Sequence, residues 1–412
     1  MGYQLIGPFT QLITLRHLAL RGALHDDQLE IISKGGLLLN ENKIQAVGSF
    51  EELLSEAKGQ NATIYPVEPN CVALPGMIDA HTHISFGGSR AKDYALRNSG
   101  KSYEEIAKAG GGIWDTVQET RKQSLHGLAE MTAVRANRLL REGITTIEVK
   151  SGYGLSVEEE EKILKAIQQA QSLTEATLIP TCLAAHVCPK DFSGDAAAYL
   201  RLLSEELLPR VKQQSLAKRI DAFVDDIAFK PSLAKVYLMQ AKAMGFEVTL
   251  HADQFSTGGS DLAIELQAVS ADHLEVSREA EIRALAASEV VAIALPGASM
   301  GLGCAFTPAR HLLDAGAMVA IASDWNPGSA PMGDLMVQAS ILATFQKLSN
   351  AEVWAGLTFR AAHALRLPDR GKLEKGLLAD FICFPVNDYR EITYQQGKLK
   401  PSMVWKHGKK IV

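Results

Sequence analysis

The sequence lacks the features that would assign it to a membrane, a secreted protein or a nucleic-acid complex. No apolar stretch approaches the ~20 residues of a membrane-spanning helix. The N-terminus lacks the basic start, apolar core and cleavage site of a signal peptide. No long basic run occurs and the formal net charge is -5, so nucleic acid is not an expected partner. The five scattered cysteines are odd in number, which predicts reduced thiols in the cytoplasm and no disulfide framework.

Cysteine and glycine motifs that would indicate a function are also missing. Cys182, His186 and Cys188 lie close together in the sequence, but one segment cannot surround a tetrahedral metal ion alone. This cluster is therefore not the favoured ligand set. No G-x-G-x-x-G turn is present, which argues against an open nucleotide-binding sheet.

What the middle of the chain does contain is a repeated pattern of a short apolar run, a polar loop and an amphipathic helix. Continuous apolar runs that alternate with helices predict a parallel sheet covered on both faces. Eight such units predict an α/β protein with a closed (β/α)8 TIM barrel, and an open doubly wound sheet is the alternative. The eight runs are residues 74–81, 144–153, 176–186, 221–229, 247–253, 271–275, 290–297 and 318–328.

Three helices between these runs have recognisable ends. Residues 128–141 precede Gly143, residues 157–171 begin with an acidic turn, and residues 231–244 begin with proline and stop before Gly245. Glycine favours a helix end, acidic side chains suit the positive end of a helix dipole, and proline fits a first helical turn. These signals support strands that are separated by helices.

The two ends of the chain differ from the middle. Residues 1–74 and 369–412 contain short strand-like pieces with turn residues between them, and neither end could bury a core alone. We expect them to pair into one small β-sandwich domain beside a hydrolase barrel of residues 75–368. Segment 84–127 is long for a loop between a strand and a helix, and loops of that length are often lids.

The last residues of the first apolar run are the most informative in the chain. His81 and His83 lie one residue apart, and side chains at positions i and i+2 of a strand point the same way. Both imidazoles can then reach one metal ion, although two surface histidines would show the same spacing. The active sites of such barrels lie at the C-terminal strand ends. Five of the eleven histidines fall there, namely His81, His83, His186, His251 and His273.

Three imidazoles and one carboxylate from these strand ends form a ligand set for zinc or another first-row divalent ion, with one position left for water. Such an ion lowers the pKa of bound water towards neutrality. The order His-x-His, His, His and Asp along the chain ends at Asp324 on the last strand. This order predicts metal-assisted hydrolysis.

The same order resembles the amidohydrolase superfamily over nearly the whole chain and, within it, the imidazolonepropionase family. The motifs that carry the resemblance are PGMIDAHTHISFGGSR, EVKSGYGL, AAH, HADQ, SADHLE, SDWNPGS and GKLEKGLLADF. The resemblance implies that 4-imidazolone-5-propanoate is hydrolysed to N-formimidoyl-L-glutamate in histidine degradation. It also implies one zinc or iron ion per chain and a cytoplasmic homodimer.

The resemblance further implies roles for individual residues. The metal ligands match His81, His83, His251 and Asp324. The substrate contacts match Arg90, Tyr153, His186, Asn326, Gly328 and Ser329. For Arg90 a solvated surface charge remains the alternative, and for Tyr153 a ring that only covers the barrel mouth.

One position departs from the family pattern. Some family members have a glutamate, proposed to handle the attacking water, where this chain has Gln254. An amide cannot accept a proton, so Gln254 is expected to orient substrate or water. Proton transfer is then expected to fall to Asp324 or His273, and His273 is also expected to stabilise the oxyanion.

Three further questions stay open at the level of the sequence. Lys150 follows the second apolar run, where it could be a carboxylated lysine that bridges two metals, a buried salt bridge or a solvated strand end. The enzyme could be another cyclic amide hydrolase or a nucleobase deaminase on the same barrel. A non-enzymatic binding protein is the last alternative, and the intact set of ligand positions argues against it.

Overall fold

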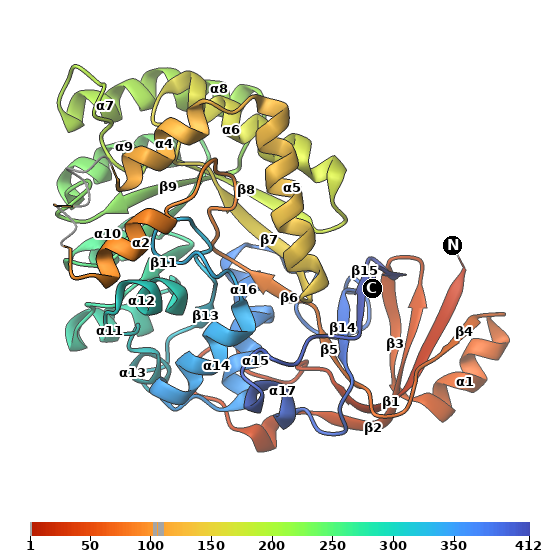
Figure 1. Cartoon of the computed structure of the whole chain (residues 1–412). Helices are drawn as coiled ribbons and strands as arrows, with labels where there is room; N and C mark the ends of the chain where they lie inside the picture. The colour runs from red at the N-terminus through yellow and green to blue at the C-terminus, as the bar shows by residue number, and fades with distance from the viewer. Residues whose placement is uncertain (1, 102–104, 106–110) are drawn as a thin grey trace.

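The structure, a computed structural model, describes residues 2–101, 105 and 111–412 and contains two sheets of different construction (Figure 1). The larger part of the chain builds eight strands that follow one another in sequence order, each parallel to its neighbour. This confirms the predicted strand–helix repeat. The strands are β6 (Met77–Asp79), β7 (Ile144–Lys150), β8 (Thr177–Ala185), β9 (Arg219–Val224), β10 (Glu247–Ala252), β11 (Ser270–His273), β12 (Val291–Ala294) and β13 (Val319–Ile321).

The extensions of the first and last strands close this sheet into a barrel. The backbone N–H of Asp324 donates to the carbonyl of His81 at 3.0 Å, and that of His83 donates to the carbonyl of Trp325 at 3.0 Å. The barrel is therefore the observed fold, and the open doubly wound sheet is excluded. Closure also brings the residues that follow β6 beside those that follow β13, although about 240 residues separate them.

The first apolar run is divided between the two sheets, which corrects the expectation of one strand over residues 74–81. Val72–Pro75 form β5 of the terminal sheet, and only Met77–Asp79 belong to the barrel. The chain crosses at Gly76, where a Cβ atom would lie 2.6 Å from the Thr145 side chain. The close approach of the two sheets therefore leaves no room for a side chain at Gly76.

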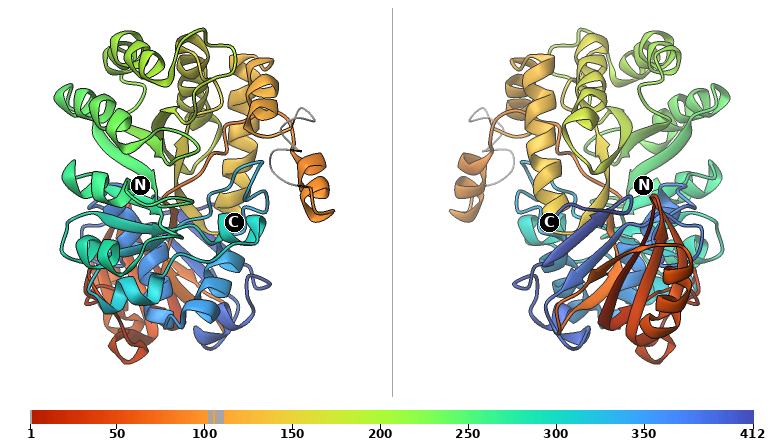
Figure 2. Two further views of the ribbon diagram at one scale, coloured as in Figure 1. Left: turned by 90° about the vertical axis from the view of Figure 1, so that its left-hand side faces the viewer. Right: turned by 90° about the vertical axis from the view of Figure 1, so that its right-hand side faces the viewer.

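Helices surround the barrel on its outer side (Figure 2). The three predicted helices are confirmed as α5 (Leu125–Arg141), α6 (Val157–Ala170) and α9 (Pro231–Ala243). Serine side chains accept backbone N–H groups at the first turns of α5 and α6, which stabilises both helix starts. The other helices of this part are α7 (Ala196–Leu202), α8 (Leu208–Gln213), α10 (Gly259–Glu265), α11 (Glu279–Ala286), α12 (Pro296–Leu302), α13 (Ala309–Asp314), α14 (Leu335–Gln346), α15 (Asn350–Leu357) and α16 (Phe359–Ala364).

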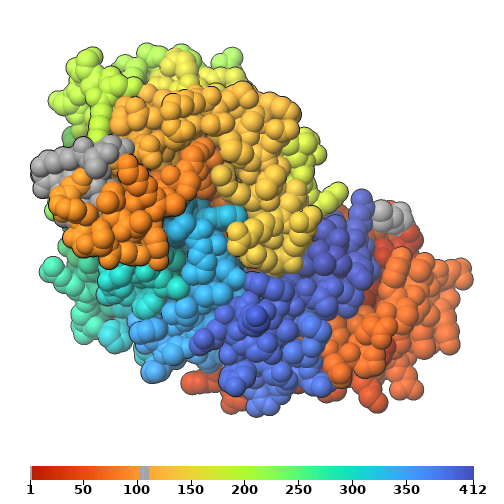
Figure 3. Space-filling model, in the orientation of Figure 1, coloured from red at the N-terminus to blue at the C-terminus, as the bar shows by residue number. Residues whose placement is uncertain are grey.

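The second sheet joins the two ends of the chain, as expected for the terminal β-sandwich. Strand β14 (Phe381–Phe384) pairs antiparallel with β5, so a strand from the C-terminal end of the chain lies beside one from the N-terminal part (Figure 3). The sheet encloses a core in which Phe381 packs on Phe9 and Trp405, with ring centroids 6.1 and 5.2 Å apart. Its other elements are β1 (Tyr3–Ile13), β2 (Ile31–Asn40), β3 (Lys43–Ser49), α1 (Phe50–Gly59), β4 (Thr63–Pro66), α17 (Arg390–Tyr394), β15 (Met403–Lys406) and β16 (Lys409–Lys410). The domain limits 1–74 plus 369–412 and 75–368 stay predictions.

The long segment 84–127 contains two described helices. Helix α2 (Ala91–Asn98) lies apart from the ring of barrel helices in Figure 2, and α4 (Ile113–Arg121) precedes α5. Residues 102–104 and 106–110 lie outside the described residues, so the predicted lid stays a prediction. In the described part of the chain, no helix combines the length and the apolar character needed to span a membrane.

Candidate metal centre and active site

Three buried imidazoles converge beyond the C-terminal ends of the barrel strands. His81 and His83 follow β6, and His251 lies near the end of β10. The Nε2 atom of His83 lies 3.2 Å from Nε2 of His81 and 3.4 Å from Nε2 of His251. Asp324 adds its Oδ1 atom, 3.5 Å from Nε2 of His81 and 3.4 Å from Nε2 of His83. The structure thus brings together all four predicted metal ligands.

This donor set fits a metal ion bound by four protein atoms. Donor atoms that bind one ion at about 2.0–2.1 Å lie roughly 3 Å or more from one another, which the separations observed here allow. The ligand atoms of the three histidines all lie within 4.8 Å of one another, so one ion between them could contact all three. His81, His83, His251 and Asp324 would therefore hold the ion, and all four are almost fully buried.

Carboxylates behind two of the histidines fix the direction of their rings. Asp272 Oδ2 lies 2.6 Å from Nδ1 of His81, and Asp221 Oδ2 lies 3.0 Å from Nδ1 of His251. A carboxylate that accepts the Nδ1–H proton leaves Nε2 free to bind a metal. Burial lowers the pKa of the His81 imidazole, but Asp272 and Asp324 outweigh it and raise that pKa to about 9. A metal ion must therefore displace a proton from His81 at neutral pH.

Lys150 is a buried ion-pair partner of these carboxylates. Its Nζ lies 2.9 Å from Glu148 Oε1, 2.8 Å from Asp221 Oδ2 and 3.7 Å from Asp272 Oδ2. Burial lowers the pKa of the Lys150 amine, but the three carboxylates raise it above its usual range. A carboxylated lysine forms from a neutral amine, so the geometry favours the salt bridge over a ligand that bridges two metals.

His186 lies at the end of β8 with its ring beside the metal centre. Its ring stacks on that of His83, with centroids 5.6 Å apart and an interplanar angle of 23°. Nδ1 donates to the carbonyl of Gly152 at 2.9 Å, since a carbonyl can only accept. Burial and the neighbouring His83 lower the pKa of His186 to about 3. His186 is therefore neutral, with its lone pair at Nε2.

Arg90 and Tyr153 approach the same region from two different loops. Arg90 donates from Nε to Asp93 Oδ2 at 2.8 Å, and a Cβ atom on Gly328 would lie 2.3 Å from its Nη1. The guanidinium thus folds from the loop after β6 onto the loop after β13, where it lines a cavity of about 390 Å³. Burial and Asp324 raise the pKa of the Tyr153 phenol above its usual range, so its hydroxyl stays protonated.

The loop after β13 holds the Asp324 carboxylate in place. Asn326 Oδ1 accepts the backbone N–H groups of Gly328 and Ser329 at 2.7 and 2.8 Å. Asn326 Nδ2 donates to Asp324 Oδ2 at 2.9 Å, and the Ser329 hydroxyl lies 3.3 Å from the same atom. Burial opposes ionisation, but His81 and His83 hold the pKa of Asp324 well below its usual range. Substrate contact by the three loop residues stays a prediction.

His273 and Gln254 lie at neighbouring strand ends. The His273 ring centroid lies 5.2 Å from that of His251, and its Nδ1 lies 3.2 Å from Glu275 Oε1. The backbone of His273 adopts φ 86°, a sparsely populated value that is typical of functional sites. Gln254 follows β10, three residues after His251, and is buried. Their roles in catalysis stay predictions.

The sequence interpretation missed the residues that orient the ligands. Asp221 and Glu148 lie within the apolar runs of β9 and β7, and Glu160 lies in the first turn of α6. Each is almost fully buried. A charged residue inside an otherwise apolar strand is a usable signal, because burial of an unpaired charge is costly. That signal could have identified Asp221 and Glu148, but not their partners.

The Cys182, His186 and Cys188 cluster does not form a metal site. His186 Nδ1 is engaged by the Gly152 carbonyl, and burial raises the pKa of the Cys182 thiol to about 12. A thiol must lose its proton to bind a metal. Cys188 is only partly buried and lies outside the group of converging nitrogens.

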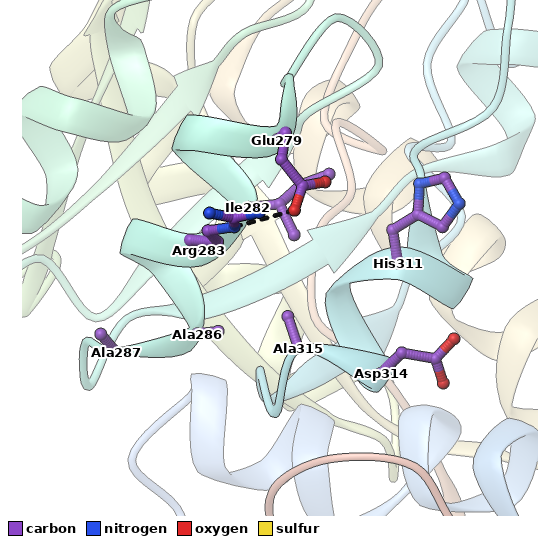
Figure 4. Close-up of a pocket in the computed structure, with 8 residues that line it drawn as sticks. All are labelled: Glu279, Ile282, Arg283, Ala286, Ala287, His311, Asp314 and Ala315. Carbon is purple, nitrogen blue, oxygen red and sulfur yellow. Dashed lines mark hydrogen bonds and ion pairs between the residues drawn. The ribbon is translucent and has the colours of Figure 1, made fainter.

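A second hollow of about 560 Å³ lies outside the barrel, between α11 and α13 (Figure 4). Two of its charged side chains, Glu279 and Arg283, pair with each other at 2.8 Å. In the described chain, none of the residues that line it belongs to the metal centre. This outer hollow is therefore separate from the candidate metal centre.

The chain is similar to known proteins over nearly its whole length. The amidohydrolase family model matches residues 72–411. An imidazolonepropionase of Bdellovibrio bacteriovorus is 37% identical over 412 residues, which cover 99% of this chain and 96% of that protein. An imidazolonepropionase of Myxococcus xanthus is 39% identical over 373 residues, which cover 90% and 88%.

A solved structure with a similar fold is atrazine chlorohydrolase from Arthrobacter aurescens TC1, complexed with zinc. It superposes with a TM-score of 0.69 at 19% identity and covers 99% of this chain and 95% of its own. At that identity the similarity concerns the fold alone.

Proposed function

The chain belongs to the amidohydrolase family, and we infer that it catalyses the imidazolonepropionase reaction. In that reaction, water opens the ring amide of 4-imidazolone-5-propanoate to give N-formimidoyl-L-glutamate, a step of histidine degradation. The observation that carries the inference is the convergence of His81, His83, His251 and Asp324 at the barrel mouth, in a chain that is similar to imidazolonepropionases over nearly its whole length.

We propose that the enzyme uses one zinc or iron ion per chain. Three imidazoles and one carboxylate suit both metals, and the zinc in atrazine chlorohydrolase shows that a related barrel holds that ion. When bound, the ion supplies a nucleophilic water at neutral pH and polarises the ring carbonyl. The protein residues then bind the substrate and move the protons.

Asp324 is the proposed proton carrier. Asn326 and Ser329 hold its Oδ2 atom in a fixed position. The carboxylate accepts the proton of the attacking water and returns it to the ring nitrogen that leaves. His273, whose Nδ1 lies beside Glu275, is proposed to donate a hydrogen bond to the oxyanion.

The proposed contact residues fall into two groups, one for the ring of the substrate and one for its propanoate carboxylate. His186 and Tyr153 face the ring, since both lie beside the His83 imidazole. Arg90 binds the propanoate carboxylate, because a guanidinium can hold a carboxylate with two parallel hydrogen bonds. Gly328 leaves the space that the guanidinium occupies.

Replacing Arg90 by alanine is expected to lower kcat/KM about 10²–10⁴-fold. Charge-assisted hydrogen bonds contribute about 1.5–3 kcal/mol each, and two would be lost. Most of the change is expected in KM, because the carboxylate is remote from the scissile bond. Steady-state kinetics with imidazolonepropanoate measure the effect, and Arg97→Ala on α2, the helix that follows Arg90, is the control. A KM within twofold of wild type, with normal metal content, would remove Arg90 from the site.

Replacing Gln254 by glutamate is expected to leave kcat within about threefold of wild type, because Asp324 already supplies a base. The amide occupies the position at which some family members have a glutamate. The measurement is kcat across a range of pH for both proteins. A gain of tenfold or more would show that the natural chain lacks an adequate base and that the proton route through Asp324 is wrong.

Product analysis separates this function from its rivals. Ring opening adds one water and releases no ammonia, whereas a nucleobase deaminase releases ammonia. A binding protein would produce neither change. We expect mass spectrometry to detect formimidoylglutamate and an ammonia assay to remain negative. Ammonia release from a nucleobase, without turnover of imidazolonepropanoate, would overturn the assignment.

We further propose that the enzyme is a cytoplasmic homodimer whose partner is a small-molecule substrate. The support is the family resemblance together with the scattered, reduced cysteines. Sedimentation of the purified protein at twice the chain mass is the expected result, and a monomer at micromolar concentration would contradict it.

A further inference from the structure

The loop between β7 and α6 controls two proposed substrate contacts at once. It carries Tyr153 directly, and its Gly152 carbonyl accepts the Nδ1–H of His186 at 2.9 Å. The centroids of the Tyr153 and His186 rings lie 5.6 Å apart. Any change in the path of this loop therefore moves both side chains.

One buried carboxylate holds the loop from below. Glu160 Oε2 accepts the backbone N–H of Gly152 at 3.0 Å. Its Oε1 accepts the N–H groups of Gly154 and Leu155 at 2.7 and 2.8 Å. Glu160 is fully buried and lies near the start of α6, where the helix dipole favours a negative charge.

Glu160 holds this position without a cationic partner. Among residues 2–101, 105 and 111–412, no lysine, arginine or histidine forms an ion pair with it. Burial raises the pKa of the carboxyl, and hydrogen bonds from Ser151 and the loop lower it in part. A buried charge of this kind is costly. The three hydrogen bonds that the Glu160 carboxylate accepts from the loop therefore indicate that it fixes the path of the loop backbone.

The loop is also packed too closely to tolerate other residues. A Cβ atom on Gly154 would lie 2.5 Å from the backbone nitrogen of Glu160. At Gly152, where φ is +111°, a Cβ atom would lie 3.0 Å from Nδ1 of His186. The two glycines therefore allow the carboxylate on one side and the imidazole on the other to contact the loop backbone.

We propose that Glu160 is a positioning residue that fixes Tyr153 and His186 for binding of the substrate ring. This inference rests on the proposed function, which makes those two residues substrate contacts. Glu160 fixes the orientation of the Gly152 peptide, whose carbonyl accepts the Nδ1–H of His186. It thereby keeps the proton of His186 on Nδ1 and the lone pair on Nε2. His186 Nε2 can then accept a hydrogen bond from a ring N–H group of the substrate. A substrate analogue with that ring nitrogen methylated cannot make this hydrogen bond.

Replacing Glu160 by glutamine tests this role with little change in volume. Glutamine has one amide oxygen and one NH₂ group, so the NH₂ group must face a loop N–H group that the second carboxylate oxygen accepts in the wild type. Two donors then face each other and that hydrogen bond is lost. We expect KM for imidazolonepropanoate to rise about 10- to 100-fold, with kcat within about threefold and metal content unchanged. A KM within twofold of wild type would overturn the inference.

Glu352→Gln is the control. Glu352 is also buried, and its oxygens accept backbone N–H groups from Leu24 and Ser349 at 3.1 and 2.8 Å, outside the barrel. Unlike Glu160, Glu352 also forms an ion pair with Arg310 at 2.9 Å, so the control matches the backbone contacts and not the charge environment. We expect this variant to lose thermal stability without a change in KM. An equal rise in KM in both variants would show that Glu160 acts only through general stability.

A second measurement needs no turnover. Nitrogen-15 NMR of the histidine rings is expected to show wild-type His186 protonated at Nδ1, and to show loss of that single tautomer in Glu160→Gln. If Glu160→Gln does not fold, Ser151→Ala removes one donor to the carboxylate and is expected to give a smaller rise in KM. An unchanged KM in that variant would count against the inference.

The two readouts separate the inference from the proposed function. If wild type does not hydrolyse imidazolonepropanoate but the tautomer changes in Glu160→Gln, only the function is wrong. If wild type is active and neither KM nor the tautomer changes, only the positioning role is wrong.

Discussion

Replacing His251 by alanine is expected to lower metal affinity on the order of 10²-fold or more and to abolish most activity. Apparent binding energies of four-ligand zinc sites are about 10–16 kcal/mol, so one ligand accounts for roughly 3 kcal/mol. His251 is the one proposed ligand from β10, and Asp221 Oδ2 lies 3.0 Å from its Nδ1. The barrel is expected to fold, because the helices and the other seven strands keep their cores.

Metal analysis after dialysis against a chelator of known affinity is the measurement, with circular dichroism to confirm the fold. His311→Ala is the control, since His311 lies on α13 beside the outer hollow (Figure 4). Full metal occupancy in purified His251→Ala would show that His251 is not a ligand.

Replacing Asp324 by asparagine is expected to lower kcat about 10²–10⁴-fold, the range that general acid–base catalysis contributes. The amide keeps an oxygen near His81 and His83 but can neither carry the proton nor supply a negative charge. Metal affinity is expected to fall as well, because a charged ligand becomes neutral. The effect on kcat should persist at saturating metal.

Kinetics at increasing metal concentration separate the two effects of this variant. Asp314→Asn, at the exposed end of α13, is the control. Recovery of wild-type kcat in Asp324→Asn at high metal would show that Asp324 is a ligand only, and that another group carries the proton.

The barrel could be predicted from the sequence because its strands are buried on both faces. Each apolar run from residue 144 onward overlaps an observed strand, and three helix ends were readable from glycine, proline and acidic residues. The first run was misread because Val72–Pro75 and Met77–Asp79 are equally apolar. Which sheet each piece joins depends on the distant strands β14 and β7, and local pattern does not contain that information.

The convergence of the four proposed metal ligands could be predicted because strand order alone brings strand ends together at one barrel mouth. The orienting groups could not, since their pairing depends on three-dimensional contacts. Asp221 meets His251 across neighbouring strands, and Glu160 meets the loop before it only after α6 folds back. The approach of Arg90 to Gly328 likewise joins loops that are far apart in the sequence.

The most direct test of a metal-dependent ring-opening hydrolase is turnover as a function of metal content. The protein is stripped of metal, reloaded with measured amounts of zinc or ferrous iron, and mixed with 4-imidazolone-5-propanoate while its ultraviolet absorbance is recorded. We expect no absorbance loss in the stripped protein and a rate that rises linearly to a plateau at one metal ion per chain. Full activity in the stripped protein, or no turnover at any loading with either metal, would contradict it.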